Sequence, residues 1–196
     1  MDNYRCCRCG LNKLEYKNGF YLCCACGSIM KKGTNLEQPL EIFASRTDAN
    51  NGDAYQQFSL GECYFYGNMI EQNYVEALRW YILSAMQGNM YAQNALGICY
   101  ASGYGVKKND KASIKWYTVS ANQGYDVAQY NLAECYYFGN GVDVDYIKAL
   151  NWYIKAAENG NWEAQRRLVQ MYTNGIGTKV DIDKANYYKN ILNERE

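Results

Sequence analysis

The stretch LGECYFYG at residues 60–67 returns three times along the chain at one fixed interval. It reappears as LGICYASG at 96–103 and LAECYYFG at 132–139, and in altered form as LVQMYTNG at 168–175. Each copy begins 36 residues after the previous one. Repetition at such a period is the signature of a protein built from stacked copies of one small unit.

Each copy has the pattern of a helical hairpin, because its apolar and small residues fall at helical spacing in two blocks. In the second copy these blocks occupy positions 92–103 and 113–121. Short polar residues that can cap free backbone N–H groups begin the second helix at Asn73, Asn109, Asp145 and Asp181. Glycines expected to end that helix in a left-handed conformation follow at Gly88, Gly124 and Gly160.

A single hairpin cannot bury its whole apolar stripe, so neighbouring hairpins must stack. The sequence therefore predicts an all-α fold, an α-solenoid of four 36-residue hairpins at 52–87, 88–123, 124–159 and 160–196. The last hairpin departs from the others at several positions, and we expect it to form a polar terminal cap.

The repeat resembles the Sel-1-like repeat, a relative of the tetratricopeptide repeat. Two segments carry the resemblance best, AQNALGICYASGYGVKKNDKASIKWYTVSANQG (92–124) and AQYNLAECYYFGNGVDVDYIKALNWYIKAAENG (128–160). It covers about residues 52–193. The resemblance implies a right-handed superhelix of antiparallel helix pairs and a role as a protein-interaction scaffold, and it supplies no catalytic residue.

Cysteine occupies one position of the first three repeats, at Cys63, Cys99 and Cys135. The fourth repeat has Met171 there, which can replace a small apolar filler but not a thiolate or a disulfide partner. We therefore expect these cysteines to pack in the core. A secreted, cysteine-rich branch of the resembled family has two disulfide-bonded cysteines per repeat and is linked to penicillin binding. One cysteine per repeat argues against that disulfide and against a β-lactamase-like activity.

The other six cysteines lie in two similar motifs, CCRCG at 6–10 and CCACG at 23–27. Two C-x-x-C-G turns can supply four thiolates to a closed tetrahedral metal site, and the spacing assigns Cys6, Cys9, Cys23 and Cys26 as ligands. The sequence predicts one structural zinc in a short zinc ribbon over residues 1–32, with a hairpin around Asn18-Gly19. Iron is the alternative metal.

Cys7 and Cys24 are left over in this register, either as free thiols or as parts of an unusual cluster. Four protein ligands leave no position for an activated water, so the predicted site is structural. So short a segment cannot hold a core, and metal binding of about 10 kcal/mol or more would have to fold it.

Residues 33–51 are predicted to be a linker followed by a capping helix at about 38–50, with Pro39 in its first turn.

The composition excludes several functions. The chain has no histidine, which excludes Ser/His and Cys/His nucleophile pairs and a histidine general base. Its 20 basic and 20 acidic residues cancel. The sequence has no signal peptide pattern and no run of 18 apolar residues, so we expect a cytoplasmic protein without a membrane partner.

The repeat register also predicts a concave binding face, made by the first helix of each hairpin. Its candidate residues are mostly aromatic and suit an extended peptide or a partner helix. They are Tyr55, Phe58, Glu62, Phe65, Tyr66, Tyr91, Asn94, Ile98, Tyr130, Glu134, Tyr137 and Phe138.

The function expected from the sequence is a non-enzymatic adaptor that binds a protein segment on this face, with no small-molecule substrate. The alternative is a nucleic-acid-associated factor. Residues 1–32 hold six basic and two acidic residues (6 − 2 = +4), a charge that would attract phosphate. The few aromatic residues of the ribbon can be accounted for by its own small core, which favours protein contact or a structural role.

Overall fold

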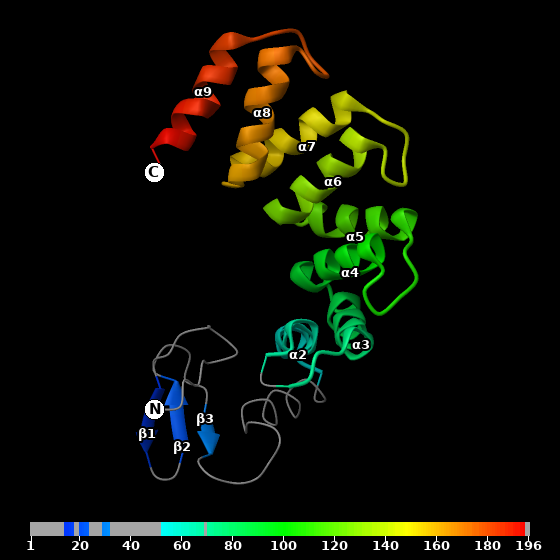
Figure 1. Cartoon of the computed structure of the whole chain (residues 1–196), viewed down its shortest axis with the longest axis vertical. Helices are drawn as coiled ribbons and strands as arrows, with labels where there is room; N and C mark the ends of the chain where they lie inside the picture. Colours follow the sequence, from blue (N-terminus) through cyan, green and yellow to red (C-terminus); the bar gives the residue numbers. More distant parts are fainter. Residues whose placement is uncertain (1–13, 18–19, 24–28, 32–51, 69, 195–196) are drawn as a thin grey trace. The chain divides into compact units, whose positions relative to one another are not determined.

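In the computed structural model, residues 14–17, 20–23, 29–31, 52–68 and 70–194 are described. The chain divides into two compact units, Met1–Asn89 and Met90–Glu196. The helices of the first unit are α2 (Ala54–Tyr66) and α3 (Tyr74–Met86). Those of the second unit are α4 (Met90–Ser102), α5 (Asp110–Asn122), α6 (Asp126–Phe138), α7 (Tyr146–Glu158), α8 (Trp162–Asn174) and α9 (Ile182–Asn193) (Figure 1).

Three short strands precede the helices: β1 (Leu14–Lys17), β2 (Phe20–Cys23) and β3 (Ile29–Lys31). They form an antiparallel sheet in the order β1-β2-β3. Lys17 pairs with Phe20, so two residues join the first two strands, and the predicted hairpin is confirmed. The turn itself, the predicted metal ligands Cys6, Cys9 and Cys26, and the predicted linker and capping helix at 33–51 lie outside the described residues.

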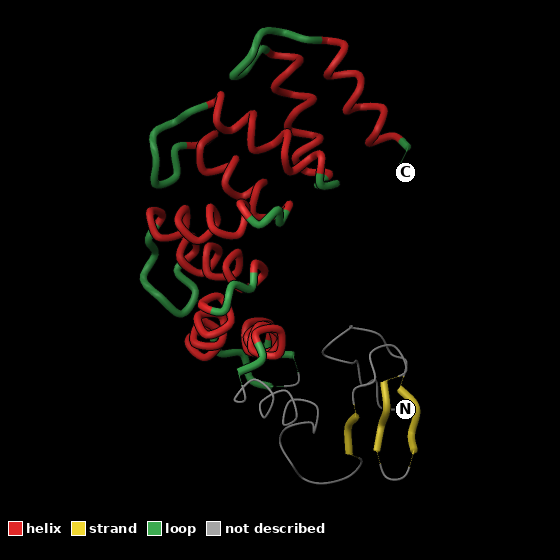
Figure 2. Tube along the Cα trace, turned by 180° about the vertical axis from the view of Figure 1, so that it is seen from behind, coloured by secondary structure: helices red, strands yellow, loops and turns green. Residues whose placement is uncertain are grey.

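The helices pair as the repeat predicts. The first unit contains the hairpin α2–α3, and the second contains α4–α5, α6–α7 and α8–α9. Within the second unit α5 packs on α6 and α7 packs on α8, so three hairpins stack in sequence order (Figure 2). The predicted stack of helical hairpins is confirmed there. In α9 the only buried residue is Ala185, as expected for a polar terminal cap.

The helix ends follow the predicted capping. The side chains of Asn73, Asn109, Asp145 and Asp181 accept hydrogen bonds from backbone N–H groups in the first turn of the second helices. At the other end Gly88, Gly124 and Gly160 have φ of 91°, 92° and 92°, a left-handed conformation that other residues rarely adopt.

Buried glutamines form hydrogen bonds within and between the hairpins. In the second unit Gln123 Nε2 donates to Gln93 Oε1 at 2.6 Å, and Asn159 Nδ2 donates to Gln129 Oε1 at 2.9 Å. Gln129 also donates to the carbonyl oxygen of Ala121 at 3.2 Å, in the preceding hairpin. One amide therefore joins α5, α6 and the end of α7 and satisfies its own polar groups.

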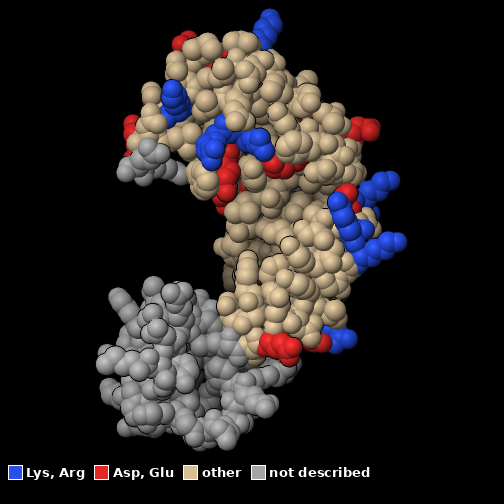
Figure 3. Space-filling view, in the orientation of Figure 1, with Lys and Arg blue, Asp and Glu red and all other residues tan. Residues whose placement is uncertain are grey.

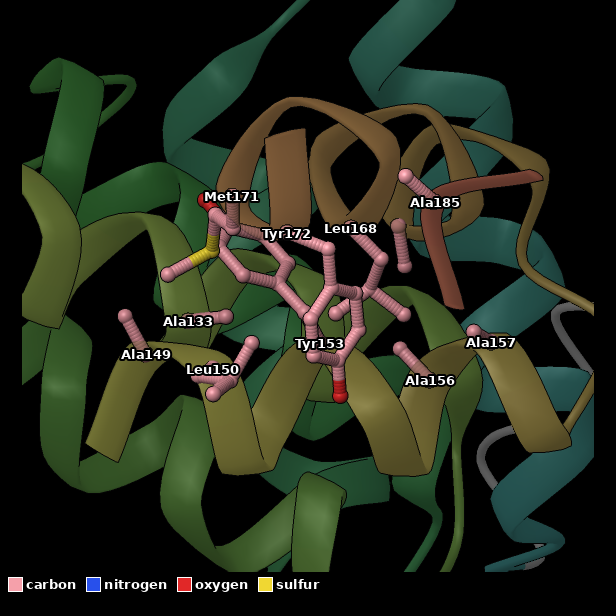
Figure 4. Packing of buried hydrophobic residues seen from close by; sticks show 11 residues of the cluster. Ala133, Ala149, Leu150, Tyr153, Ala156, Ala157, Leu168, Met171, Tyr172 and Ala185 are labelled. Carbon is pink, nitrogen blue, oxygen red and sulfur yellow. The ribbon is translucent and has the colours of Figure 1, made fainter. Parts of the chain in front are cut away.

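The core is made of the same positions in each repeat. Leu60, Leu96, Leu132 and Leu168 are at most 1% exposed. In the third and fourth hairpins Tyr153, Leu168, Met171 and Tyr172 pack together with alanines from α6, α7, α8 and α9 (Figure 4). Tyr136 and Trp152 contact both this cluster and the one around Tyr117 and Leu132, so the core continues through the second unit.

A small residue follows each of the first three leucines because a buried tyrosine ring lies against it. A Cβ added to Gly61 would lie 2.6 Å from two ring carbons of Tyr81, and one added to Gly97 would be closer still to Tyr117. In the third hairpin Ala133 and Tyr153 belong to one buried cluster. This contact sets how closely the two helices of a hairpin approach.

Gly61→Ala tests this contact. Replacing glycine by alanine inside a helix ordinarily stabilises it by about 1 kcal/mol. Here overpacking against Tyr81 should outweigh that gain, and we expect a net loss of about 1–2 kcal/mol in the free energy of unfolding. Urea denaturation followed by circular dichroism measures it. Ser59→Ala in the same helix is the control, and equal stabilisation by both changes would contradict the close approach.

Candidate functional site

The repeat cysteines are packing residues. Cys63, Cys99 and Cys135 are buried, with Cys99 fully inaccessible. Met171, at the equivalent position of the fourth repeat, is 1% exposed. Burial raises the pKa of the Cys135 thiol to about 12, which disfavours the reactive thiolate. The described residues contain no group of three potential metal ligands.

The predicted binding face contains exposed and half-buried aromatic rings. Tyr55, Tyr66 and Phe138 are exposed, at 65%, 61% and 53%. Asn94 is buried instead, and its side-chain oxygen accepts a hydrogen bond from Asn131 Nδ2 at 2.9 Å, which links α4 to α6. The other members are half-buried: Phe58, Glu62, Phe65, Tyr91, Ile98, Tyr130, Glu134 and Tyr137.

Two glutamates of this face bind the core tyrosines. Tyr81 OH donates to Glu62 Oε1 at 2.5 Å, and Tyr153 OH donates to Glu134 Oε1. Burial raises the pKa of Glu62, and the hydrogen bond from Tyr81 partly opposes that shift. These carboxylates hold the face in place, so they are less available to a partner than the sequence suggested.

Arg167 of α8 completes the arrangement in the second unit. Its Nε and one terminal nitrogen donate to the two oxygens of Glu134 at 2.9 and 3.1 Å. The guanidinium also lies 5.6 Å from the ring centres of Tyr137 and Phe138. A bidentate pair of this kind fixes both side chains. The sequence prediction missed Arg167. The equivalent residue one repeat earlier is Asn131, so the repeat pattern does not indicate an arginine at this position.

Next to this pair lies a polar pocket of about 240 Å³, lined by Tyr130, Glu163, Arg166, Arg167 and Gln170. The Arg166 guanidinium lies 5.6 Å from the ring centre of Trp162 and forms no salt bridge within the described part of the chain. Basic and acidic atoms lie beside one another in this region, while most of the face visible in Figure 3 is uncharged. The pocket can therefore bind an acidic or polar group beside an aromatic surface.

These features define an α-solenoid of short helical hairpins. The sequence profile described as the Sel1 repeat matches residues 57–89, 91–125, 126–161 and 162–188. The chain belongs to the Sel1 repeat family. Members of this family generally mediate protein–protein interactions and are typically not enzymes.

Solved structures agree with this assignment. A protective antigen of uropathogenic Escherichia coli with an SLR fold is 32% identical, with a TM-score of 0.76 over 79% of this chain and 33% of its own. A Sel1 repeat protein from Oxalobacter formigenes is 33% identical, with a TM-score of 0.73 over 80% of this chain and 46% of its own. This chain thus spans less than half the length of either protein.

The Helicobacter pylori cysteine-rich protein B is a more distant neighbour. It is 19% identical, with a TM-score of 0.52 over 65% of this chain and 91% of its own, and shows the shared fold. A search of curated protein sequences finds no match. No helix in the described part of the chain is long and apolar enough to cross a membrane.

The buried thiols give a direct test of the packing. In the native protein iodoacetamide should leave Cys63, Cys99 and Cys135 unmodified, because all three side chains are buried, and all three should react in guanidinium chloride. Peptide mass spectrometry measures modification at each cysteine separately. Rapid native labelling of Cys99 would show that this position is not part of a closed core.

Proposed function

We propose that this protein is a non-enzymatic adaptor that binds a segment of another protein on the face made by the first helices of its repeats. The observation that carries the proposal is the set of accessible aromatic rings on these helices, best exposed at Tyr66 in the first unit and Phe138 in the second. Aromatic side chains bury a large area at low cost in conformational entropy, and they dominate protein-binding sites.

The surroundings of Phe138 favour a partner with polar groups beside an apolar anchor. Phe138 packs edge-on against Tyr137, with ring centres 4.9 Å apart, and Arg167 lies over both rings. The adjoining pocket contains Arg166 and Glu163. A partner segment can therefore place an apolar side chain on Phe138 and a carboxylate near Arg166.

The ribbon is proposed as a second contact module, folded around one zinc held by Cys6, Cys9, Cys23 and Cys26. An antiparallel sheet whose second strand ends at Cys23 is consistent with a ribbon in which the two cysteine motifs flank a hairpin. The metal would cross-link these turns and stabilise a segment too short to fold alone.

Phe138→Ala should weaken capture of the partner about tenfold or more, because a central exposed anchor is lost. The full-length protein serves as bait in an extract of the native host, with nuclease and high salt, and quantitative mass spectrometry measures the captured proteins. Ile147→Ala on α7 is the matched control, since Ile147 is 64% exposed but lies on a second helix.

The proposal holds if wild type and Ile147→Ala retain the same protein and Phe138→Ala loses it. Equal capture by all three baits would overturn the assignment of the face. Loss of the captured proteins on addition of nuclease or salt would instead support the nucleic-acid alternative, because phosphate contacts weaken steeply with ionic strength.

The purified protein should contain about one zinc per chain, measured by inductively coupled plasma mass spectrometry, as a closed four-thiolate site requires. Cys9→Ser and Cys26→Ser should each remove most of it. Cys7→Ser and Cys24→Ser are the matched controls and should keep it. Iron in place of zinc, or equal loss in all four variants, would contradict the assigned ligands.

A further inference from the structure

The second repeat lacks an aromatic pair that the first and third repeats share. Phe65 of the first repeat and Tyr137 of the third correspond to Ala101 in the second. Their ring partners Tyr74 and Tyr146 correspond to Asp110. The second repeat therefore has two small or polar side chains where its neighbours have two rings.

The neighbouring repeats show what these rings contact. In the first unit Phe65 packs edge-on against Tyr74, with ring centres 5.1 Å apart, and lies 6.2 Å from Tyr81. In the third repeat Tyr137 packs edge-on against Tyr146 at 5.2 Å and lies 6.4 Å from Tyr153. The same ring position is thus filled in the same way in both repeats.

In the second repeat this place is a pocket. It has a volume of about 270 Å³, and Ala101 lines it together with Asp110, Tyr117 and Asn131. These last three stand 36 residues before Tyr146, Tyr153 and Arg167, the residues that surround the Tyr137 ring. The pocket is therefore lined by residues equivalent to those around Tyr137, but the second repeat places no aromatic ring there. A cavity of about 150 Å³ suffices for benzene, so there is room for one aromatic side chain.

The pocket also contains an unsatisfied polar group. The Ser113 hydroxyl is in its lining, and the residue is 2% exposed. This hydroxyl has no hydrogen-bond partner of ordinary geometry among the described residues. Burial raises the pKa of the Tyr117 phenol, and the nearby Ser113 hydroxyl partly opposes that shift. A buried hydroxyl without a partner costs free energy that a suitable ligand group can recover.

The neighbouring tyrosines have a carboxylate that Tyr117 lacks. Tyr81 and Tyr153 donate to glutamates two positions after the repeat leucine. The second repeat has Ile98 at that position. Ser113 and Tyr117 therefore bring two hydroxyl groups to the lining, which also contains the charged residues Lys108, Asp110 and Glu134.

We propose that this pocket binds an aromatic side chain of the partner, with tyrosine preferred over phenylalanine. The ring would take the place that Tyr137 occupies one repeat later, and its hydroxyl would pair with Ser113. This inference rests on the proposed function and deepens it, because it names the anchor residue of the bound segment. The partner ring would make the aromatic contact that Ala101 cannot make.

Nuclear magnetic resonance of the full-length protein tests the pocket without knowledge of the partner. The probes are N-acetyl-tyrosinamide, N-acetyl-phenylalaninamide and N-acetyl-leucinamide, each titrated against the ¹⁵N-labelled chain. The tyrosine probe should shift the amide signals of Ala101, Ser113 and Tyr117. It should bind about fivefold or more tightly than the leucine probe, because only an aromatic ring matches the walls.

Three variants make the result specific. Ala101→Phe adds the ring that the first repeat has, fills the pocket and should abolish the shifts. Ser102→Phe is the matched control, since it adds the same ring at the next position, where Tyr66 and Phe138 are exposed in the other repeats, and should leave binding unchanged. Ser113→Ala, which leaves the cavity open, should bring the tyrosine and phenylalanine probes to equal affinity.

Absence of shifts at the pocket, equal binding of the leucine probe, or unchanged binding to Ala101→Phe would each overturn the inference. An unaltered preference for tyrosine in Ser113→Ala would overturn the assigned hydroxyl contact. These results are independent of capture through Phe138. Failure of the pocket alone would leave the adaptor function standing. Equal capture by wild type and Phe138→Ala, together with intact probe binding, would overturn the assigned face and leave the pocket standing.

Discussion

The contact between a small residue and a buried tyrosine ring sets the geometry of each of the first three repeats. Gly61 and Gly97 have no side chain because the rings of Tyr81 and Tyr117 occupy that space. The ring thereby holds the two helices of a hairpin close together. It also decides where the phenol hydroxyl lies, which is at the face of the first helix. The acidic side chains of that face and the pocket of the second repeat both depend on this position.

The proposed binding face is therefore partly an extension of the core. Glu134 looks from its sequence like a free surface charge, yet it accepts hydrogen bonds from Tyr153 and Arg167. These hydrogen bonds hold Glu134, Tyr153 and Arg167 each in one orientation, and they leave each side chain with less capacity for further hydrogen bonds. A partner bound as proposed would meet a prearranged surface of rings and paired charges, so it would lose less entropy than at a mobile surface.

The repeat could be predicted from the sequence because its period, its caps and its apolar positions all agree. Asn109 and Gly124 marked helix ends by local chemistry alone, and the structure has them where the pattern indicated. The site was harder to predict, since pairs between repeats depend on side-chain reach and not on register. Arg167 of the fourth hairpin contacts Glu134 of the third, and Asn94 is buried and hydrogen-bonded to Asn131. The pocket was visible in the sequence only as the absence of a ring at Ala101.

The amide of Gln129 has a consequence for how the second unit comes apart. It accepts from Asn159 in its own hairpin and donates to Ala121 in the hairpin before. Separating these hairpins would strand a buried donor or acceptor, a penalty of about 1–3 kcal/mol. In a linear array such coupling between neighbours determines cooperativity. The second and third hairpins should accordingly open together, as one exchange-protected block, instead of fraying one hairpin at a time.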